Sequence, residues 1–234
     1  MKVIITGAGK GIGYELAKIF SNEKRAEIFI ISRSEGKLNI LKDECLRINN
    51  GASIHTIAAN LTSDDDFSDV INKIGRGHID ILVNNAGLLI NKKYEDFNAA
   101  EVQALIQTNF IMPARLIAAL LPEMGGTLPT HVVNIGSMGG FQGSFKFPGL
   151  SYYSASKAAL ANLTECLATE FKDSNIIFNC LAFGSVKTEM FSDAFPGFEA
   201  RLTAMQAAEF IYNFAVKGYN YFNGKILPVS VSTP

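Results

Sequence analysis

The chain has 234 residues, of which 48% are hydrophobic and 18% charged, and 21 basic side chains nearly balance 22 acidic ones. This apolar content excludes intrinsic disorder, and a chain of this length buries enough surface to fold without a disulfide or a structural metal. The near-neutral charge, without a basic run, argues against nucleic acid or an anionic membrane as a partner. The most apolar stretch, residues 110–122, is too short for a membrane span and contains Arg115 and two prolines.

The three cysteines, Cys45, Cys166 and Cys180, are odd in number and lack the spacing of metal ligands. We therefore expect reduced thiols, no metal site and a cytoplasmic location. The residues after Met1 run into glycines and charges rather than the apolar core of a secretory signal, which favours the same location.

Short runs rich in β-branched residues alternate with segments of helical length. Four runs, the first, second, fourth and fifth, are nearly continuously apolar, as expected of strands covered on both faces. Between Tyr153 and Phe171 an apolar residue recurs at every fourth position, which predicts a helix. In chain order the predicted strands are residues 3–6, 27–32, 52–59, 79–84, 131–137, 175–182 and 224–230.

This alternation predicts the fold class: α/β, with a parallel sheet of about seven strands and helices on both faces. No linker, repeat or change of composition divides the chain, so residues 1–234 are expected to form a single doubly wound, Rossmann-like domain. In such a domain, ligands bind at the carboxyl ends of the strands.

The first predicted strand runs into the sequence TGAGKGIG, residues 6–13. Gly7, Gly11 and Gly13 allow a sharp turn, a close approach of backbone N–H groups to a phosphate, and tight packing of the next helix. The start of that helix offers its positive end to the anion. The spacing does not match G-x-G-x-x-G, because Ile12 stands between the last two glycines. On this motif alone, a phosphate-binding turn and a purely structural turn both remain open.

Three motifs follow one another in the chain: the glycine turn, NNAG at 84–87 and Tyr-x-x-x-Lys at 153–157. Each is weak alone, but together, over essentially the whole chain, they resemble the short-chain dehydrogenase/reductase family. The resemblance implies an NAD(P)(H)-dependent oxidoreductase that interconverts alcohols and carbonyl compounds. It also implies a homodimer or homotetramer.

Tyr153 is the expected catalytic acid/base. Lys157 lies one helical turn further on, and a nearby ammonium lowers the pKa of a phenol from its ordinary value of about 10. The neighbouring Tyr152 has Ser156 at the corresponding position and so lacks this partner. Ser137, at the end of the fifth predicted strand, matches the family's catalytic serine, which holds the substrate oxygen. A surface Tyr/Lys pair is the alternative that the spacing alone leaves open.

Asn109 matches the family's helix asparagine, whose main chain is implied to hold a water molecule that links the catalytic lysine to solvent. Pro113 has no N–H to bond the Asn109 carbonyl, which would leave that carbonyl free to accept from water. Alternatively, Pro113 only kinks the helix, and the two effects are compatible.

The end of the second predicted strand indicates which cofactor is used. Where an acidic residue would bind the ribose of NAD, the chain has Ser32 and Arg33, and an arginine can accommodate a 2′-phosphate. Lys10 adds a cation in the glycine turn, so we expect NADP(H) to be preferred over NAD(H), with a solvated surface pair as the alternative. The carbonyl of Asn60 is expected to accept from the adenine amine. The full set of expected cofactor contacts is Gly7, Lys10, Gly11, Ile12, Gly13, Ser32, Arg33, Asn60, Leu61, Asn84, Ala86, Gly87, Tyr153, Lys157, Gly184, Val186 and Thr188.

The chain departs from the family pattern in two places. Phe183 stands where a proline usually precedes Gly184, and the sequence lacks a diglycine ending, which favours a dimer over a tetramer. Between them, residues 188–202 combine aromatic residues with a Pro-Gly pair, which predicts either a mobile lid over an apolar substrate or ordinary packing. Phe141, Phe145 and Phe147 are candidates for the opposite wall.

The intact set of Ser137, Tyr153 and Lys157 favours an NADPH-dependent enzyme that reduces a ketone or aldehyde to an alcohol, or catalyses the reverse reaction. The substrate is expected to be a small, apolar carbonyl compound or alcohol. The alternative is a non-catalytic NADP(H)-binding sensor or interaction module on the same fold.

Overall fold

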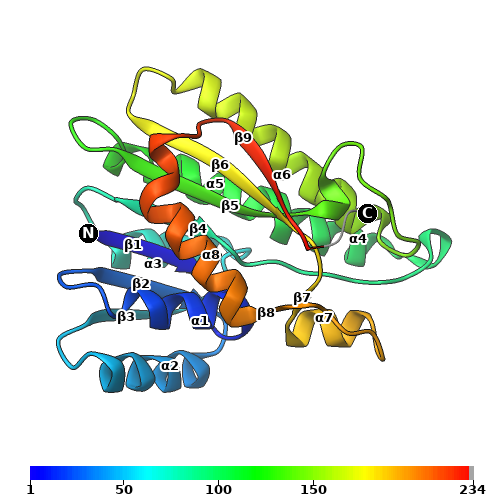
Figure 1. The fold of residues 1–234 in the computed structure, drawn as a ribbon, viewed down its shortest axis with the longest axis horizontal. Helices are drawn as coiled ribbons and strands as arrows, with labels where there is room; N and C mark the ends of the chain where they lie inside the picture. The colour runs from blue at the N-terminus through cyan, green and yellow to red at the C-terminus, as the bar shows by residue number, and fades with distance from the viewer. Residues whose placement is uncertain (232–234) are drawn as a thin grey trace.

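The computed structural model describes residues 1–231, within which seven strands form one parallel sheet in the order β3-β2-β1-β4-β5-β6-β9 (Figure 1). All seven strands correspond to runs identified in the sequence, so the predicted α/β class and Rossmann-like topology are confirmed. Strand order reverses at the neighbouring pair β1 and β4, where doubly wound folds bind their ligands. The strands are β1 (Lys2–Thr6), β2 (Glu27–Ser32), β3 (Ser53–Ala58), β4 (Ile81–Asn84), β5 (Thr130–Ser137), β6 (Ile176–Phe183) and β9 (Lys225–Val229).

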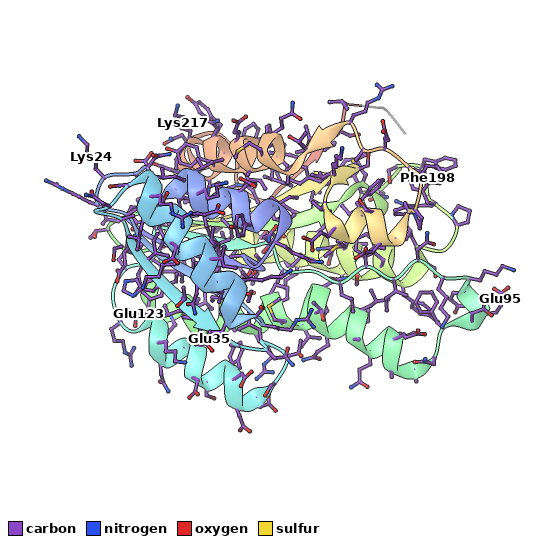
Figure 2. All side chains as sticks on the ribbon, turned by 90° about the horizontal axis from the view of Figure 1, so that it is seen from below. Lys24, Glu35, Glu95, Glu123, Phe198 and Lys217 are labelled. Carbon is purple, nitrogen blue, oxygen red and sulfur yellow. The ribbon has the colours of Figure 1, made fainter. Side chains whose placement is uncertain are left out.

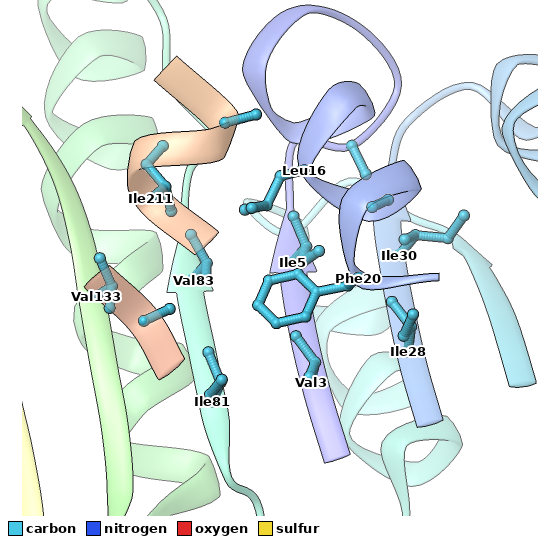
Figure 3. Packing of buried hydrophobic residues seen from close by; sticks show 14 of the residues in the cluster. Val3, Ile5, Leu16, Phe20, Ile28, Ile30, Ile81, Val83, Val133 and Ile211 are labelled. Atoms are coloured by element: carbon cyan, nitrogen blue, oxygen red, sulfur yellow. The ribbon is translucent and has the colours of Figure 1, made fainter. Parts of the chain in front are cut away.

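Helices cover both faces of the sheet (Figure 1). Successive strand residues point to opposite faces, so each strand supplies two separate cores. The first core lies under α1 (Gly11–Phe20), α2 (Glu35–Ile48) and α8 (Ala204–Lys217), and the second under α3 (Asp64–Ile74), α5 (Met112–Leu120) and α6 (Ser151–Glu170). Figure 3 shows the first core through Val3, Ile5, Leu16, Phe20 and Ile211.

The burial of α6 differs from the simplest interpretation of its sequence. The apolar residues at every fourth position do not form its buried face, because Ala155 is exposed and Leu163 and Leu167 are only partly buried. The buried face instead carries Ser156, Lys157, Leu160, Ala161, Thr164 and Ala168. Half of these six side chains are polar, so this helix must satisfy several hydrogen bonds inside the molecule.

Ala99–Glu123 is one continuous helical run, in which α4 (Ala99–Ile106) leads through a π-turn at Gln107–Ile111 into α5. Pro113 is the second residue of α5, and the N–H of Met112 donates to the carbonyl of Gln107, five residues back. The helix therefore accommodates its proline next to a π-turn that contains Asn109. By length and composition this run could cross a membrane, but here its buried residues cover the sheet.

Two elements were not expected from the sequence. β7 (Val186–Lys187) and β8 (Leu202–Thr203) form a two-residue parallel pair, with Val186 opposite Leu202. Residues 188–201, including α7 (Glu189–Ala194), therefore leave and rejoin the body of the protein at one point, beside the carboxyl ends of the main strands (Figure 1). The predicted lid corresponds to this segment, and its motion stays a prediction.

A buried histidine connects β5, β6 and α8. His131 is 1% exposed; its Nδ1 lies 3.0 Å from the carbonyl oxygen of Ala215, and the Asn179 amide lies 3.0 Å from its Nε2. Because a carbonyl only accepts, Nδ1 carries the proton and Nε2 accepts from Asn179. The ring is therefore neutral, and burial lowers the pKa of His131 from 6.5 to about 4.

We expect this neutral histidine to make stability depend on pH. Between pH 6.5 and pH 4 the unfolded chain binds a proton that the folded chain does not, so the free energy of unfolding falls as the pH falls through this window. At about 1.4 kcal/mol per pH unit, the wild type should lose about 2 kcal/mol more than His131→Gln between pH 7 and pH 4.5. Urea unfolding of both proteins measures the difference. Equal losses would show that His131 does not control this titration.

Candidate active site

The carboxyl ends of β1, β2, β4, β5 and β6 open onto one cavity of about 1490 Å³, which α7 borders on one side. Sites for small molecules usually measure about 300–1,000 Å³, so this cavity has room for a dinucleotide and a substrate together. The cavity is lined by most of the residues singled out in the sequence: Gly7, Lys10, Gly11, Ile12, Ser32, Arg33, Asn60, Leu61, Ala86, Gly87, Ser137, Tyr153, Lys157, Gly184, Val186 and Thr188.

The glycine turn fits the role of a phosphate cradle. Gly7 has φ +70°, and a Cβ there would lie 2.7 Å from the Cα of Ala86, so only glycine allows these backbones to meet. α1 begins at Gly11, and Lys10 at its N-cap provides no side-chain hydrogen bond to the first turn. The first N–H groups of α1 are thus left for an anion, at a place where Gly11 and Ile12 line the cavity.

Gly13 serves the packing of α1 and does not line the cavity. A Cβ at Gly13 would lie 2.5 Å from the Asn85 amide nitrogen and 2.7 Å from the Gly7 carbonyl oxygen. This agrees with the expectation that one glycine of the turn lets the helix approach the strand closely, and it removes Gly13 from the residues that can touch a cofactor.

Asn84 was expected at the cavity wall but lies beneath it. Its side-chain amide donates to Asn134 on β5 at 2.8 Å, and the residue is buried at the end of β4. The wall is formed instead by Asn85, whose amide donates to the carbonyl of Thr6 at 2.9 Å. Asn84 ends β4 and is held against β5, whereas Asn85 lies just past the strand, where it lines the cavity at the carboxyl edge of the sheet.

Ser137 and Tyr153 meet in the cavity, although 16 positions separate them in the chain. Ser137 ends β5, and its hydroxyl accepts from the N–H of Gly139 at 3.1 Å. Burial raises the pKa of Tyr153, and a hydrogen bond with the Ser137 hydroxyl acts in the opposite direction. The expected lowering of the Tyr153 pKa by Lys157 is not found in this state: desolvation raises the pKa, and the group that opposes the rise is Ser137.

Lys157 is 4% exposed and donates from Nζ to the Ile135 carbonyl at 2.8 Å. Burial lowers the pKa of its ammonium to about 8, partly opposed by the neighbouring Cys180. A Cβ at Gly87 would lie 3.5 Å from Nζ, so the ammonium lies beside the cofactor-facing NNAG segment.

Asn109 lies behind the cavity and does not line it. Its Oδ1 accepts from the N–H of Leu88 at 2.8 Å, and its amide donates to the Leu88 carbonyl at 2.8 Å and to Ser156 Oγ at 2.9 Å. Ser156 in turn donates to the Tyr153 carbonyl at 2.7 Å. The side chain of Asn109 thus fixes α6 against the segment after NNAG; the release of its main-chain carbonyl to water stays a prediction. No motif in the sequence marks Ser156 as a positioning residue.

The residues expected near the adenine end show one difference. The Oδ1 of Asn60, expected to accept from the adenine amine, instead accepts from the N–H and the hydroxyl of Thr62 at 3.3 and 2.8 Å. Both lone pairs of this oxygen are used in the turn, because an amide oxygen accepts two hydrogen bonds. Arg33 is exposed at the cavity edge, and its binding of a 2′-phosphate stays a prediction.

Phe183 replaces the family's proline without disturbing the neighbouring strands. Its ring is buried and meets Phe210 of α8 edge-on, with centroids 6.3 Å apart. The N–H of Gly184 donates to the Val229 carbonyl at 3.0 Å, which continues the pairing of β6 with β9 up to the cavity. The ring of Phe183 thus packs in the first core and anchors the loop that follows β6, and Gly184 still lines the cavity.

Aromatic residues form part of the cavity lining. Phe191 and Phe195 of the 188–201 segment lie with ring centroids 5.1 Å apart, and both line the cavity together with Phe147 and Phe198. Phe198 is 73% exposed and lies toward the opposite end of the molecule from Lys24 (Figure 2). Of the three residues expected in the opposite wall, only Phe147 lines the cavity.

Comparison with known proteins agrees with this geometry. A family model described as short chain dehydrogenase matches residues 1–197. Human retinol dehydrogenase 8 is 31% identical over 233 residues, which cover 97% of this chain and 70% of that protein. The chain therefore belongs to the short-chain dehydrogenase family, whose members are nicotinamide-dependent oxidoreductases acting on small molecules.

Solved structures show the same fold. A short chain dehydrogenase from Burkholderia cenocepacia in complex with NADP has a TM-score of 0.86 at 22% identity, covering 97% of this chain and 95% of that one. A 3-ketoacyl-(acyl-carrier-protein) reductase from Brucella melitensis complexed with NADH has a TM-score of 0.82 at 23% identity, covering 98% and 96%. These structures establish the architecture around the cavity.

The buried ammonium of Lys157 is expected to cost stability. The pKa of Lys157 is about 8 in the folded chain and 10.5 in the unfolded chain. The charged side chain therefore opposes folding, fully below pH 8 and progressively less between pH 8 and pH 10.5. Lys157→Met removes the charge and keeps an apolar stem, at the cost of the hydrogen bond to Ile135. We expect the free energy of unfolding to rise by about 1–2 kcal/mol at pH 7 and the gain to vanish near pH 10.5. Denaturant unfolding at both pH values tests this, and a less stable variant at pH 7 would contradict it.

Proposed function

We propose that the protein is an NADPH-dependent reductase of apolar ketones or aldehydes, or catalyses the reverse oxidation. The observation that supports this most directly is the contact of Ser137 with Tyr153, beside Lys157, in a cavity that begins at the glycine turn. A cofactor-binding module without catalysis would have no need for a contacting pair of hydroxyl groups and a buried ammonium at the far end of its cofactor site.

Each residue of this group has a separate task. When bound, the nicotinamide cofactor supplies the hydride, while the protein provides placement and electrostatics. Tyr153 donates the proton to the substrate oxygen, and Ser137 holds that oxygen beside the phenol. Lys157 has no carboxylate partner at ion-pair distance within residues 1–231. It offers its N–H groups to the cofactor ribose, and its positive charge favours the phenolate left on Tyr153.

The proposed apolar substrate rests on the aromatic wall. Phe147, Phe191, Phe195 and Phe198 contribute to the same cavity as Tyr153. An apolar ligand between these rings is removed from water, which favours binding by roughly 25 cal/mol for each Å² of apolar surface buried. Retinol dehydrogenase 8, a relative by sequence, is named for an alcohol of this apolar kind, and the segment 188–201 would close over such a substrate as a lid.

The proposed preference for NADP(H) rests on Arg33 and Lys10 at the end of the cavity opposite Tyr153. The related structures include complexes with NADP and with NADH, so the fold accepts either cofactor and the choice lies in these side chains. Assembly as a homodimer or homotetramer is part of the same proposal, supported by the partly exposed apolar residue Leu163 on α6. A cytoplasmic location stays a prediction.

Tyr153→Phe tests the proton donor. Only one hydroxyl is lost, so NADPH binding should change little, while kcat should fall by at least about 10²-fold, the lower end of what general acid catalysis contributes. NADPH oxidation at 340 nm with a panel of apolar carbonyl compounds measures it. Tyr152→Phe is the matched control, because Tyr152 stacks on Tyr94 outside the Ser137 contact, and it should keep nearly all of the activity. A Tyr153→Phe protein with more than about a tenth of the wild-type kcat would exclude this residue as the acid.

The double substitution Ser32→Asp with Arg33→Ile tests cofactor choice. A carboxylate at position 32 would accept from a ribose hydroxyl and repel a 2′-phosphate, whereas the lost guanidinium had paired with that phosphate. We expect the ratio of kcat/KM for NADPH to that for NADH to exceed one in the wild type and to fall by at least about tenfold, below one, in the variant. A wild type that prefers NADH would show that Arg33 does not bind the phosphate.

A further inference from the structure

Three charged side chains from separate elements meet at the edge of the cavity. Lys10 precedes α1, Lys37 belongs to the first turns of α2, and Glu189 is the first residue of α7. The Oε2 of Glu189 lies 2.9 Å from the Nζ of Lys10 and 3.9 Å from the Nζ of Lys37. All three residues line the cavity, so this ion-pair cluster lies at the proposed cofactor site rather than elsewhere on the surface.

The position of the cluster points to the 2′-phosphate. A Cβ at Gly9 would lie 2.8 Å from the Oγ of Ser32 and 3.9 Å from the Cβ of Lys37, so the stem of Lys37 lies against the same glycine turn as the end of β2. Arg33 follows Ser32 directly. Lys10, Arg33 and Lys37 are thus three cations around one corner of the cavity, and Glu189 is the carboxylate bound to two of them.

The carboxylate of Glu189 is ionised at neutral pH, because Lys10 holds its pKa below the ordinary value. Its side chain is 59% exposed, and that of Lys10 is 43% exposed. Ion pairs at this exposure are weak, usually below about 1 kcal/mol, and are screened by salt. A phosphate carries nearly twice the charge of a carboxylate and three acceptor oxygens, so it can displace Glu189 from the lysines.

We propose that Glu189 is an internal competitor for the cofactor's 2′-phosphate, and that Lys37 is a third phosphate-binding cation of that site. The proposal rests on the proposed use of NADP(H). Without cofactor, Glu189 occupies Lys10 and Lys37; when the phosphate enters, both ammonium groups turn to it and the carboxylate is released. Because Glu189 starts α7, its release also unties the 188–201 segment from the glycine turn. Cofactor affinity and lid position are thereby coupled through one carboxylate.

The experiment compares two nucleotides that differ only in the group concerned. Adenosine 2′,5′-bisphosphate carries the 2′-phosphate, adenosine 5′-monophosphate lacks it, and neither needs a substrate or turnover. Their dissociation constants are measured by isothermal titration calorimetry at low salt with the wild type, Glu189→Gln and Lys37→Gln. Asp193→Asn is the matched control, since it removes the same charge from the same exposed helix, outside the ion-pair cluster.

Glu189→Gln should bind the bisphosphate about 3- to 10-fold more tightly than the wild type, and Lys37→Gln should bind it more weakly by a similar factor. Binding of the monophosphate should stay unchanged in both variants, and Asp193→Asn should behave as the wild type. The gain in Glu189→Gln should shrink at high salt, because the competing ion pair is then screened.

Two results would overturn the inference while leaving the proposed function intact. One is an unchanged affinity of Glu189→Gln for the bisphosphate in a protein that binds NADPH. The other is an equal gain for both nucleotides, which would place Glu189 beside the shared 5′-phosphate. A wild type that binds neither NADPH nor the bisphosphate would instead overturn the proposed NADP(H) dependence, and this inference with it.

Discussion

The meeting of Tyr153 with Ser137 depends on the polar face that α6 presents to the sheet. Lys157 donates to the Ile135 carbonyl, Thr164 accepts from Asn134, and Ser156 accepts from Asn109, so one helix is fixed to β5 and to the π-turn. A buried polar group left without a partner costs about 1–3 kcal/mol, so a shift of α6 by one residue would break several bonds at once. The single register that satisfies all of them is the one that brings Tyr153 to Ser137.

The two ends of the cavity use charge in different ways. Near Tyr153, one ammonium is buried, held by a carbonyl and close to losing its proton at neutral pH. At the glycine-turn end, the cations Lys10 and Lys37 are solvated and already neutralised in part by Glu189. A buried charge acts strongly on one neighbouring atom, whereas solvated charges act weakly and can exchange partners. The first arrangement suits a proton transfer, and the second suits a ligand that must enter and leave.

The sequence predicted what depends on neighbours in the chain. Short runs rich in β-branched residues marked all seven strands, and three motifs marked the glycine turn and the Tyr153 group. What escaped prediction depends on residues far apart: the burial of Ser156 beside Asn109, the turn toward the core of Asn84, and the pairing of Glu189 with Lys10 across 179 positions. A local pattern cannot show that a polar side chain has a distant partner. The sequence of α6 therefore predicted that its regularly spaced apolar residues form the buried face, whereas polar side chains such as Lys157 and Thr164 are buried in the structure.

The short β7–β8 pair has a consequence for how such a protein can change. The two ends of the 188–201 segment are joined at Val186 and Leu202, so the length of chain between them can vary without moving β5, which carries Ser137, or α6, which carries Lys157. Doubling a loop of this kind costs only about 0.6 kcal/mol in closure entropy. Insertions and replacements between these residues can therefore reshape one wall of the cavity and leave Ser137, Tyr153 and Lys157 in place.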